Sequence, residues 1–203
     1  MVSTLEDVVQ AIEALRRQRS RIVVGVSGFG GSGKSTLTRF LVSTVPAIAR
    51  IRGDDFLDPD RSHRRSGEWD GVERRRLRRE VLDPFREGRA SEFRRFDWEL
   101  GELGAPEPLP AAEVLVVDAV GLFHPELHGA IDLRIWVDVD LETATARGKE
   151  RDRAAGHDHD HLWDDVWGPN ERDFMSAFDP RRTADMRYQP TDAAAGVRSL
   201  DRG

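Results

Sequence analysis

The sequence predicts an α/β protein in which a mostly parallel sheet lies between two layers of helices, a three-layer αβα sandwich. Short apolar runs rich in β-branched residues recur along the chain, and segments with helical spacing separate them. Alternation of this kind is typical of parallel strands, because each needs a crossover connection to the next. The length of 203 residues suits one hydrophobic core, so we expect a single domain over residues 1–203.

The predicted elements follow one another from the N-terminus. Residues 4–18 have apolar side chains at helical spacing, after a capping-box pattern formed by Ser3 and Glu6, which predicts an N-terminal helix. Residues 21–26, "RIVVGV", have the composition of a strand buried on both faces, and a glycine-rich loop joins them to a helix over residues 34–42. Further strands are predicted at residues 47–51, 113–120, 133–139 and 184–188.

The composition limits the classes of partner and compartment. The chain has 37 acidic and 31 basic residues, a formal charge of −6, which argues against a protein that coats nucleic acid or binds a membrane surface. We therefore expect a small-molecule partner, no nucleic acid and no membrane. There is no cysteine, which excludes disulfides and thiolate metal sites. Neither a signal-peptide pattern nor an apolar run of about 18 residues occurs, so we expect a cytoplasmic protein.

A glycine-rich stretch at residues 28–35, "GFGGSGKS", matches the pattern G-x-x-x-x-G-K-[ST] between a predicted strand and a predicted helix. In that context the backbone N–H groups of the loop and of the helix N-terminus surround phosphate oxygens, which predicts a P-loop NTPase. We expect Lys34 to reach the β- and γ-phosphates, Ser35 to bind Mg²⁺ and Thr36 to contact the α-phosphate. The expected nucleotide-binding residues are Gly28, Gly30, Gly31, Ser32, Gly33, Lys34, Ser35 and Thr36.

Three acidic residues lie at or just after the carboxyl ends of predicted strands, at the edge of the sheet where doubly wound folds bind their ligands. Asp54 and Asp55 come after the second strand, where one of them is placed to accept a hydroxyl proton during phosphoryl transfer or to hold Mg²⁺ through water. The alternative is an Asp-rich turn that caps the next segment. Asp118 ends an apolar strand as a Walker-B acid does, which predicts a second Mg²⁺ contact.

Residues 118–121 also match D-x-x-G, a pattern of GTP-hydrolysing switches. The N-K-x-D motif that would read guanine does not follow a later strand, because the nearest stretch, "NERD" at residues 170–173, lacks the lysine. We therefore do not favour a switch protein, and the choice between ATP and GTP stays open on these motifs alone.

Basic residues are concentrated after the fourth predicted strand, in residues 144–156. Cations on a mobile segment stabilise the charge on a transferring phosphoryl group when closure excludes water, so residues 147–165 are a candidate lid. A solvated helix face with neighbouring acidic partners explains the same run equally well. The basic residues are Arg147, Lys149, Arg151 and Arg153.

Two other charged stretches have an ordinary structural interpretation. "RRRLRRE" at residues 74–80 suits phosphates or RNA, but apolar side chains on one face favour a solvated amphipathic helix. "HDHDH" at residues 157–161 would place His157 and His161 on one face only if it were helical, and only then would they chelate a metal. Because it follows Ala-Ala-Gly, we favour a solvated loop.

Seven stretches of the chain, taken in order, carry a resemblance to known proteins. They are "GVSGFGGSGKST", "DDFLDPDRSHRRSGEWD", "REVLDPFREG", "RRFDWELGEL", "VLVVDAVGLFHPEL", "IWVDVDLETATARGKERD" and "DPRRTADMRY". In this order they resemble the uridine kinase and phosphoribulokinase family of P-loop kinases, and they cover most of residues 21–188.

The resemblance implies transfer of a phosphate from ATP to a small-molecule hydroxyl, with Mg²⁺ and with Lys34 in the P-loop. It implies that Asp54, in a D-x-F motif with Phe56, is the base, and that Arg147 and Arg151 are the lid arginines. "RRTADM" would lie near the adenine. The alternative is a P-loop protein that binds ATP, or hydrolyses it slowly, to regulate a partner without a small-molecule acceptor. The sequence does not fix the oligomeric state, for which a homodimer is one option.

Two regions depart from the family's pattern. Asp118 and Ala119 stand where the family commonly has Glu and Gly, which shortens the Walker-B acid by one methylene. "RRFDWELGEL" stands where uridine kinases typically have Tyr-Asp-Phe-Asp-His-Pro, so we expect a different acceptor pocket. Arginines would suit a phosphate or carboxylate on the acceptor, and aromatic rings would stack on a base or sugar. The candidate acceptor residues are Asp55, His63, Arg65, Trp69, Arg95 and Asp97.

Overall fold

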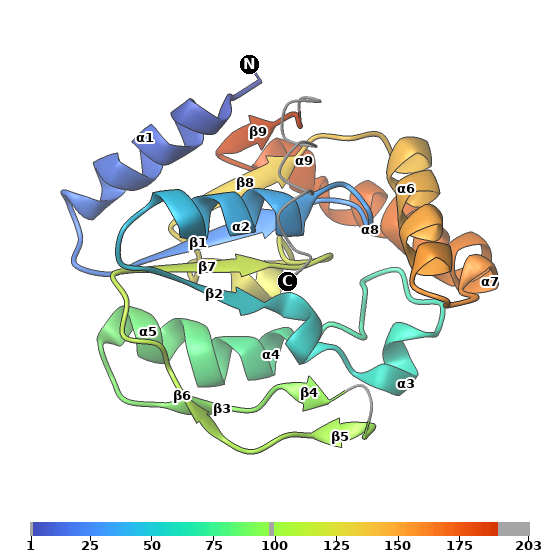
Figure 1. Cartoon of the computed structure of the whole chain (residues 1–203), viewed down its shortest axis with the longest axis horizontal. Coiled ribbons are helices and arrows are strands. Elements are labelled where there is room, and N and C mark those ends of the chain that lie inside the picture. The colour runs from blue at the N-terminus through green and yellow to red at the C-terminus, as the bar shows by residue number, and fades with distance from the viewer. Residues whose placement is uncertain (1, 98–99, 191–203) are drawn as a thin grey trace.

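A parallel sheet of five strands forms the centre of the protein within residues 2–97 and 100–190, the part of the chain that this computed structural model describes (Figure 1). The strand order is β2-β7-β1-β8-β9, and every neighbouring pair is parallel. Each strand lies where the sequence predicts one, so the predicted αβα architecture is confirmed. The strands are β1 (Ile22–Ser27), β2 (Ile48–Arg52), β7 (Val114–Asp118), β8 (Leu133–Val137) and β9 (Met186–Tyr188).

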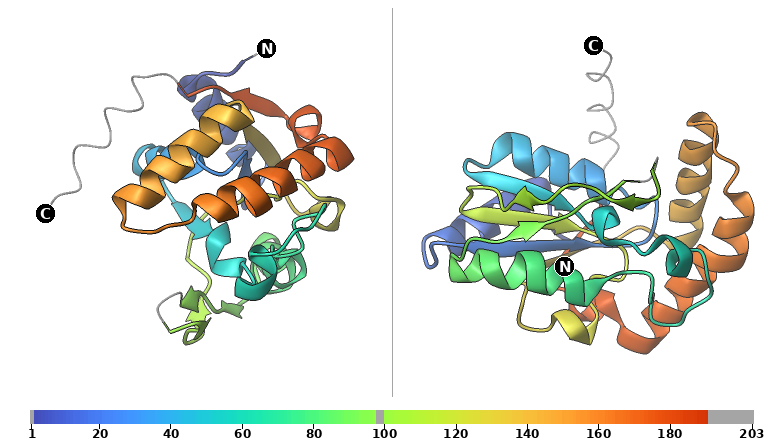
Figure 2. Two further views of the ribbon diagram at one scale, coloured as in Figure 1. Left: turned by 90° about the vertical axis from the view of Figure 1, so that its right-hand side faces the viewer. Right: turned by 90° about the horizontal axis from the view of Figure 1, so that it is seen from below.

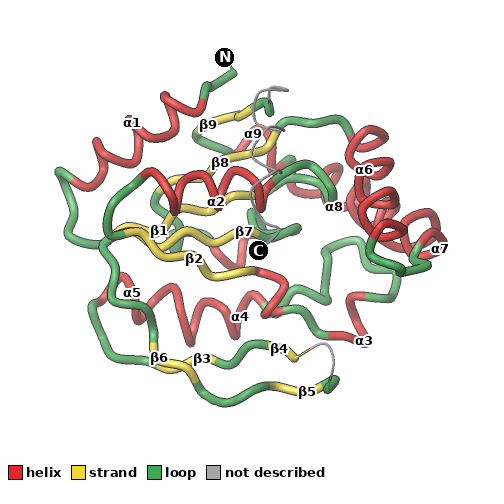
Figure 3. Tube along the Cα trace, in the orientation of Figure 1, coloured by secondary structure: helices red, strands yellow, loops and turns green. Residues whose placement is uncertain are grey.

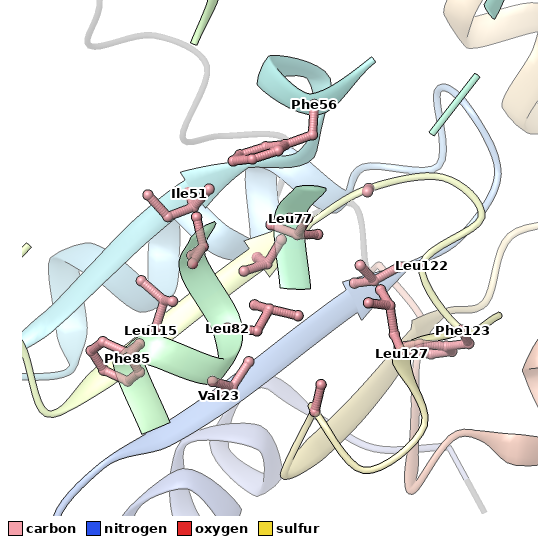
Figure 4. Close-up of a cluster of buried hydrophobic side chains, with 14 of the residues drawn as sticks. Val23, Ile51, Phe56, Leu77, Leu82, Phe85, Leu115, Leu122, Phe123 and Leu127 are labelled. Carbon is pink, nitrogen blue, oxygen red and sulfur yellow. The ribbon is translucent and has the colours of Figure 1, made fainter. Parts of the chain in front are cut away.

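Two layers of helices cover the sheet, because its central strands carry apolar side chains on both faces. They are α1 (Leu5–Arg16) and α2 (Lys34–Thr44) on one face, and α4 (Arg74–Leu77), η2 (Arg78–Leu82) and α5 (Asp83–Glu87) on the other. The alternation is visible in β1, where Val24 packs toward α1 and α2 while Val23 packs toward Leu82 and Phe85 (Figure 4).

A group of helices lies beyond the carboxyl ends of the strands, at the right of Figure 1 and toward the viewer in the left panel of Figure 2. The group consists of α6 (Leu141–Ala154), α7 (Asp160–Leu162), η4 (Trp163–Trp167) and α8 (Gly168–Phe178). The turn η4 is π-helical and joins α7 to α8. This group therefore covers the edge of the sheet at which the phosphate loop begins.

The remaining elements are short, and the sequence did not predict the strands among them (Figure 3). Two antiparallel pairs, β3 with β6 and β4 with β5, connect α5 to β7. None of the helices in the described ranges is long and apolar enough to cross a membrane. The elements are η1 (Gly53–Phe56), α3 (Pro59–Ser62), β3 (Glu92–Phe93), β4 (Phe96–Asp97), β5 (Glu102–Leu103), β6 (Glu107–Pro108), η3 (Pro125–Leu127) and α9 (Pro180–Thr183).

The N-terminal cap of α1 differs by one residue from the expected pattern. Thr4, and not Ser3, is the N-cap, and it forms a capping box with Asp7 instead of Glu6. Ser3 instead donates its backbone N–H to the carbonyl of Arg187, beside β9. The pairing of the chain start with an edge strand therefore fixes which residue begins the helix.

The arginine-rich helix is also less solvated than the sequence suggested. Arg74 and Arg76 are buried beneath the loops that follow the sheet. Arg74 donates to the carbonyls of Gly121 and Trp69, and Arg76 donates to the carbonyl of Asp55. These guanidinium groups donate to loop carbonyls near the sheet, which is a structural role that helical periodicity does not reveal.

The phosphate loop packs tightly against α6. A Cβ atom added to Gly31 would lie 2.1 Å from the carbonyl oxygen of Ala144 and 2.8 Å from the backbone nitrogen of Gly148. Gly31 also has a φ of 80°, in the left-handed region that favours glycine. Only glycine therefore allows the loop and α6 to approach this closely.

We predict that Gly31→Ala lowers the free energy of unfolding by about 2 kcal/mol or more, because the methyl group meets backbone atoms as well as an unfavourable φ. Gly129→Ala is the matched control, since Gly129 has a φ of 76° but no heavy atom of the described residues within 4 Å of its added Cβ. We expect the control to lose only about 1 kcal/mol, the cost of the left-handed φ. Equal losses in urea unfolding would show that contact with α6 does not matter.

Candidate active site

The predicted phosphate loop occupies residues 28–33, between β1 and α2. Gly31 and Gly33 have φ values of 80° and 102°, so the loop turns back on itself as a phosphate cradle requires. Among the described residues no side chain caps the first turn of α2. The Thr36 N–H donates to the Gly33 carbonyl at 3.1 Å, so the N–H groups of Lys34 and Ser35 at the start of this helix are the ones that would bind an anion.

Lys34 lies inside the loop. Its Nζ atom donates to the carbonyl oxygens of Gly28 at 3.0 Å and Phe29 at 2.8 Å. Burial lowers the pKa of the Lys34 ammonium, and three carboxylates act against that shift. These carboxylates belong to Glu171, Asp54 and Asp118.

Asp118 ends β7 and is 5% exposed. Ser35 Oγ donates to its Oδ2 at 2.9 Å, so the two expected Mg²⁺ contacts lie side by side. Arg50, from the neighbouring strand β2, donates through Nε to Oδ1 and through Nη2 to Oδ2, each at 2.7 Å. A hydroxyl and a carboxylate supply the hard oxygen ligands that Mg²⁺ prefers, so Ser35 and Asp118 fit the metal. Bound Mg²⁺ would either share the Asp118 carboxylate with Arg50 or displace Arg50 from it.

Asp54 and Asp55 lie in η1, directly after β2, but in opposite environments. The Asp54 side chain is 57% exposed, with Arg52 Nη2 at 3.7 Å from its Oδ2, and its charge acts on Lys34. Asp55 is buried, with Arg95 Nη1 at 3.4 Å from its Oδ2, and burial raises the pKa of its carboxyl group. Asp54 is therefore the acid open to the loop, and Asp55 is a buried neighbour.

Most of the candidate lid cations have acidic partners. Arg151 donates through Nε and Nη2 to Asp152 Oδ1 at 3.0 and 2.7 Å, and its charge also acts on Lys34. Lys149 donates to Asp164 at 2.6 Å, and Arg153 is bonded to Asp160. Arg147 is exposed on α6. The acidic partners agree with a charged helix face, and the lid role of this segment stays a prediction.

Glu171, on α8, is a residue of the site that the sequence did not single out. Its Oε1 accepts the backbone N–H of Gly30 at 2.6 Å, inside the phosphate loop. The side chain is buried, and its Oε2 has no hydrogen-bond partner among the described residues. Burial raises the pKa of Glu171 to about 7, although Lys34 and the Gly30 N–H favour the carboxylate. In the sequence Glu171 appeared only as part of the stretch "NERD", which was considered as a guanine-reading motif.

The acceptor candidates fall into two groups. Asp55, Arg95 and Asp97 lie at η1 and β4, where Arg95 also donates to Glu107. Arg65 instead reaches α8, bonding to Asn170 and, at 2.5 Å, to Asp173. The other two, His63 and Trp69, lie near the second group: the His63 ring is 6.0 Å from that of Trp167, and Trp69 is buried against Phe174.

The histidine-rich stretch does not form one helical face, because α7 begins at Asp160, after His157. The His157 and His159 rings stack at 5.3 Å, and His159 Nδ1 lies 3.3 Å from Asp152 Oδ2. Within residues 2–97 and 100–190 there is no group of three or more His, Cys, Asp or Glu side chains placed to hold a metal.

A polar hollow of about 500 Å³ lies over the "RRTADM" stretch. The resemblance implies that this stretch lies near the adenine, which stays a prediction. One of its lining residues, Arg181, donates to Asp138 at 2.8 Å. The lining residues are Asp179, Arg181, Arg182, Ala184, Asp185 and Arg187.

Proteins similar to this chain carry the names of kinases. A uridine-cytidine kinase C of Dictyostelium discoideum is 26% identical over 133 residues, which are 63% of this chain and 29% of that protein, so the chain spans less than a third of this relative. A structure of a possible uridine kinase from Bacillus stearothermophilus has a TM-score of 0.69 at 16% identity, covering 91% of this chain and 96% of its own.

A putative fructose transport system kinase from Silicibacter sp. TM1040 has a TM-score of 0.73 at 21% identity, covering 93% of this chain and 100% of its own. No family profile matches the chain. The likenesses confirm the P-loop NTPase fold and the resemblance to uridine kinase-like P-loop kinases that the motifs indicate.

We predict that Arg50→Met destabilises the protein by about 2–4 kcal/mol, because the buried Asp118 carboxylate loses its counter-charge. Adding Asp118→Asn to this variant removes that charge, so the double variant should lose less than the sum of the two single variants. Urea unfolding of the four proteins measures the coupling. Additive losses would show that the ion pair contributes nothing.

We predict that Glu171→Gln stabilises the protein above pH 7 by about 1–3 kcal/mol. The wild-type carboxyl binds a proton in the folded state up to about pH 7 but releases it near pH 4.5 when unfolded, so wild-type stability falls as pH rises through that window. The advantage of the variant should therefore grow from pH 5 to 7 and then stay constant. Asp165→Asn, an equal charge change at an exposed position of η4, should show no such growth.

Proposed function

We propose that this uridine kinase-like chain is an ATP-dependent phosphotransferase that moves the γ-phosphate to a hydroxyl group of a small molecule. One observation supports this function above others: an exposed carboxylate, Asp54, lies at the end of β2 within electrostatic reach of Lys34, the cation of the phosphate loop. Phosphoryl transfer to an alcohol needs such a pair, because one group holds the phosphate while the other receives the hydroxyl proton.

In this proposal the phosphate loop and α2 hold the nucleotide. The backbone N–H groups of the loop and of the first turn of α2 bind the phosphate oxygens, and Lys34 leaves its two loop carbonyls to reach the β- and γ-phosphates. Ser35 and Asp118 would hold Mg²⁺, which when bound neutralises charge on the β- and γ-phosphate oxygens. Arg50 orients the Asp118 carboxylate.

Asp54 acts as the general base. The acceptor oxygen attacks the γ-phosphorus, its proton passes to the Asp54 carboxylate, and the bond from phosphorus to the β–γ bridging oxygen breaks to leave ADP. Exposure keeps this carboxylate accessible to an incoming hydroxyl, in contrast to the buried Asp55. Arg147 and Arg151 on α6 would approach the transferring group, with Arg151 exchanging Asp152 for phosphate oxygens.

The acceptor belongs to the class of nucleosides and sugars. The names of the relatives, a uridine-cytidine kinase, a possible uridine kinase and a putative fructose transport system kinase, all point to polyhydroxylated molecules. Arg95 and Asp97, beyond the carboxyl end of β2, supply charged groups that would bind hydroxyls. The buried Trp69 is a packing residue in this proposal.

We predict that Asp54→Asn lowers kcat for acceptor phosphorylation by about 10²–10⁴-fold, because the amide cannot take the proton. The affinity for ATP should change less than about threefold, since Asp54 does not bind the nucleotide in this proposal. The measurement is ADP release with ATP and Mg²⁺ across a panel of nucleosides and sugars, with product mass checked for one added phosphate. Asp60→Asn, an exposed acid in the same segment, is the matched control.

Two results would contradict the proposal. Retention of turnover by Asp54→Asn would exclude Asp54 as the base. Binding of ATP without any acceptor that exceeds the water background would instead favour a protein that binds or slowly hydrolyses ATP to regulate a partner.

A further inference from the structure

A buried acid from outside the P-loop motif lies inside the phosphate loop. Glu171 comes from α8, 141 residues after Gly30, and its Oε1 accepts the Gly30 N–H at 2.6 Å. The side chain is 4% exposed. In a P-loop the backbone N–H groups are the donors that bind phosphate oxygens, so a carboxyl oxygen takes a position typical of a phosphate ligand.

The second oxygen of this carboxyl group is the unusual feature. Oε2 is buried and has no hydrogen-bond partner among the described residues. Buried polar oxygens almost always have a partner, so one without a protein partner points to a water, a ligand or a bound proton. Lys34 does not supply that partner here, because its ammonium donates to the carbonyls of Gly28 and Phe29.

The surroundings exclude solvent from the group. The Trp163 ring packs on the Gly30 backbone, so that an added Cβ there would lie 2.8 Å from it. The adjoining cavity, lined by Phe29, Phe174 and Met175 among others, has a volume of about 10 Å³, which barely holds one water. Lys34 on α2 acts electrostatically on Glu171, and Lys34 is itself within electrostatic reach of Asp54 on η1, Asp118 on β7 and Arg151 on α6.

We propose that Glu171 binds the terminal phosphate of the nucleotide as a neutral acid, with Oε1 accepting the Gly30 N–H and the Oε2 hydroxyl donating its proton to a phosphate oxygen. This inference rests on the proposed function, because it needs a nucleoside triphosphate in the loop. Glu171 would then be a hydrogen-bond donor from α8, in addition to the glycine amides and Lys34. The position of α8 would thereby depend on whether a γ-phosphate is bound.

Proton uptake follows from this arrangement. Burial raises the pKa of Glu171 to about 7, so the free protein carries the carboxylate above that pH. A carboxylate would repel phosphate, and binding therefore takes one proton from solvent without breaking any bond of the nucleotide. Affinity for the triphosphate should fall as pH rises above 7 and should be nearly constant below it.

The test is isothermal titration of wild-type protein with Mg²⁺ and the β,γ-imido analogue of ATP, from pH 6 to 8.5, in two buffers of different ionisation enthalpy. We expect uptake of nearly one proton at pH 8 and up to about tenfold weaker binding per pH unit above 7. With ADP, which lacks only the γ-phosphate, neither effect should appear.

Two substitutions of Glu171 distinguish a side chain that donates a hydrogen bond to the phosphate from one that only blocks the loop. Glu171→Gln keeps a donor beside the acceptor oxygen, so it should bind the analogue about tenfold more tightly than wild type at pH 8 and take up no proton. Glu171→Ala lacks the donor and should bind more weakly than Glu171→Gln. Asp165→Asn, the exposed control, should behave as wild type, and thermal unfolding of each variant verifies that it is folded.

Three results would overturn the inference. The first is binding to wild type with no proton uptake. The second is equal gains in Glu171→Gln and Glu171→Ala, which would mean that the carboxylate merely obstructs the loop. The third is an equally steep pH dependence in Glu171→Gln, which would assign the titration to Lys34 or to the analogue. None of these needs the acceptor, so acceptor phosphorylation in the ADP assay would leave the proposed function standing.

Discussion

The ion pair between Arg50 and Asp118 holds together the elements that carry the phosphate site. Arg50 reaches across from β2 to both carboxylate oxygens at the end of β7, and Ser35 joins α2 to the same group. Charges buried in a medium of low polarity are stable only when they are paired, so this contact fixes the relative positions of the three elements. Asp54 follows β2 directly, and its position relative to Ser35 depends on that pair.

Several charged groups of the site already have hydrogen-bond partners without a nucleotide. Lys34 is held by loop carbonyls, Arg151 by Asp152 and Asp118 by Arg50. Binding of a triphosphate would therefore replace existing hydrogen bonds of these side chains with bonds to phosphate oxygens. Each new phosphate contact would leave a carboxylate or carbonyl without its former partner, which reduces the net gain in binding free energy. Arg151 is an example: if it moved to a phosphate it would release Asp152, which would still accept the Trp163 indole N–H, now at 2.9 Å.

Local patterns account for the parts of the site that could be predicted. The five central strands, the phosphate loop and the position of Asp118 follow from apolar runs and glycine spacing, which are properties of short segments. Arg50 and Glu171 could not be found in this way, because their partners are 68 and 141 residues distant and nothing local distinguishes them from solvated charges. The buried Arg74 and Arg76 escaped prediction for the same reason.

The π-helical turn η4 explains how Glu171, which is 141 residues from Gly30 in the sequence, reaches the phosphate loop. A π turn contains one residue more than an α turn, and each residue rotates an α-helix by about 100°, so η4 changes which face of α8 meets the loop. Trp163, at the start of the turn, packs on Gly30 and on Gly148, and a Cβ on either glycine would collide with its ring. The same turn therefore anchors α8 to the loop through Trp163 and directs Glu171 at the Gly30 amide. Its irregular geometry links the helices beyond the sheet edge to the glycine-rich loop.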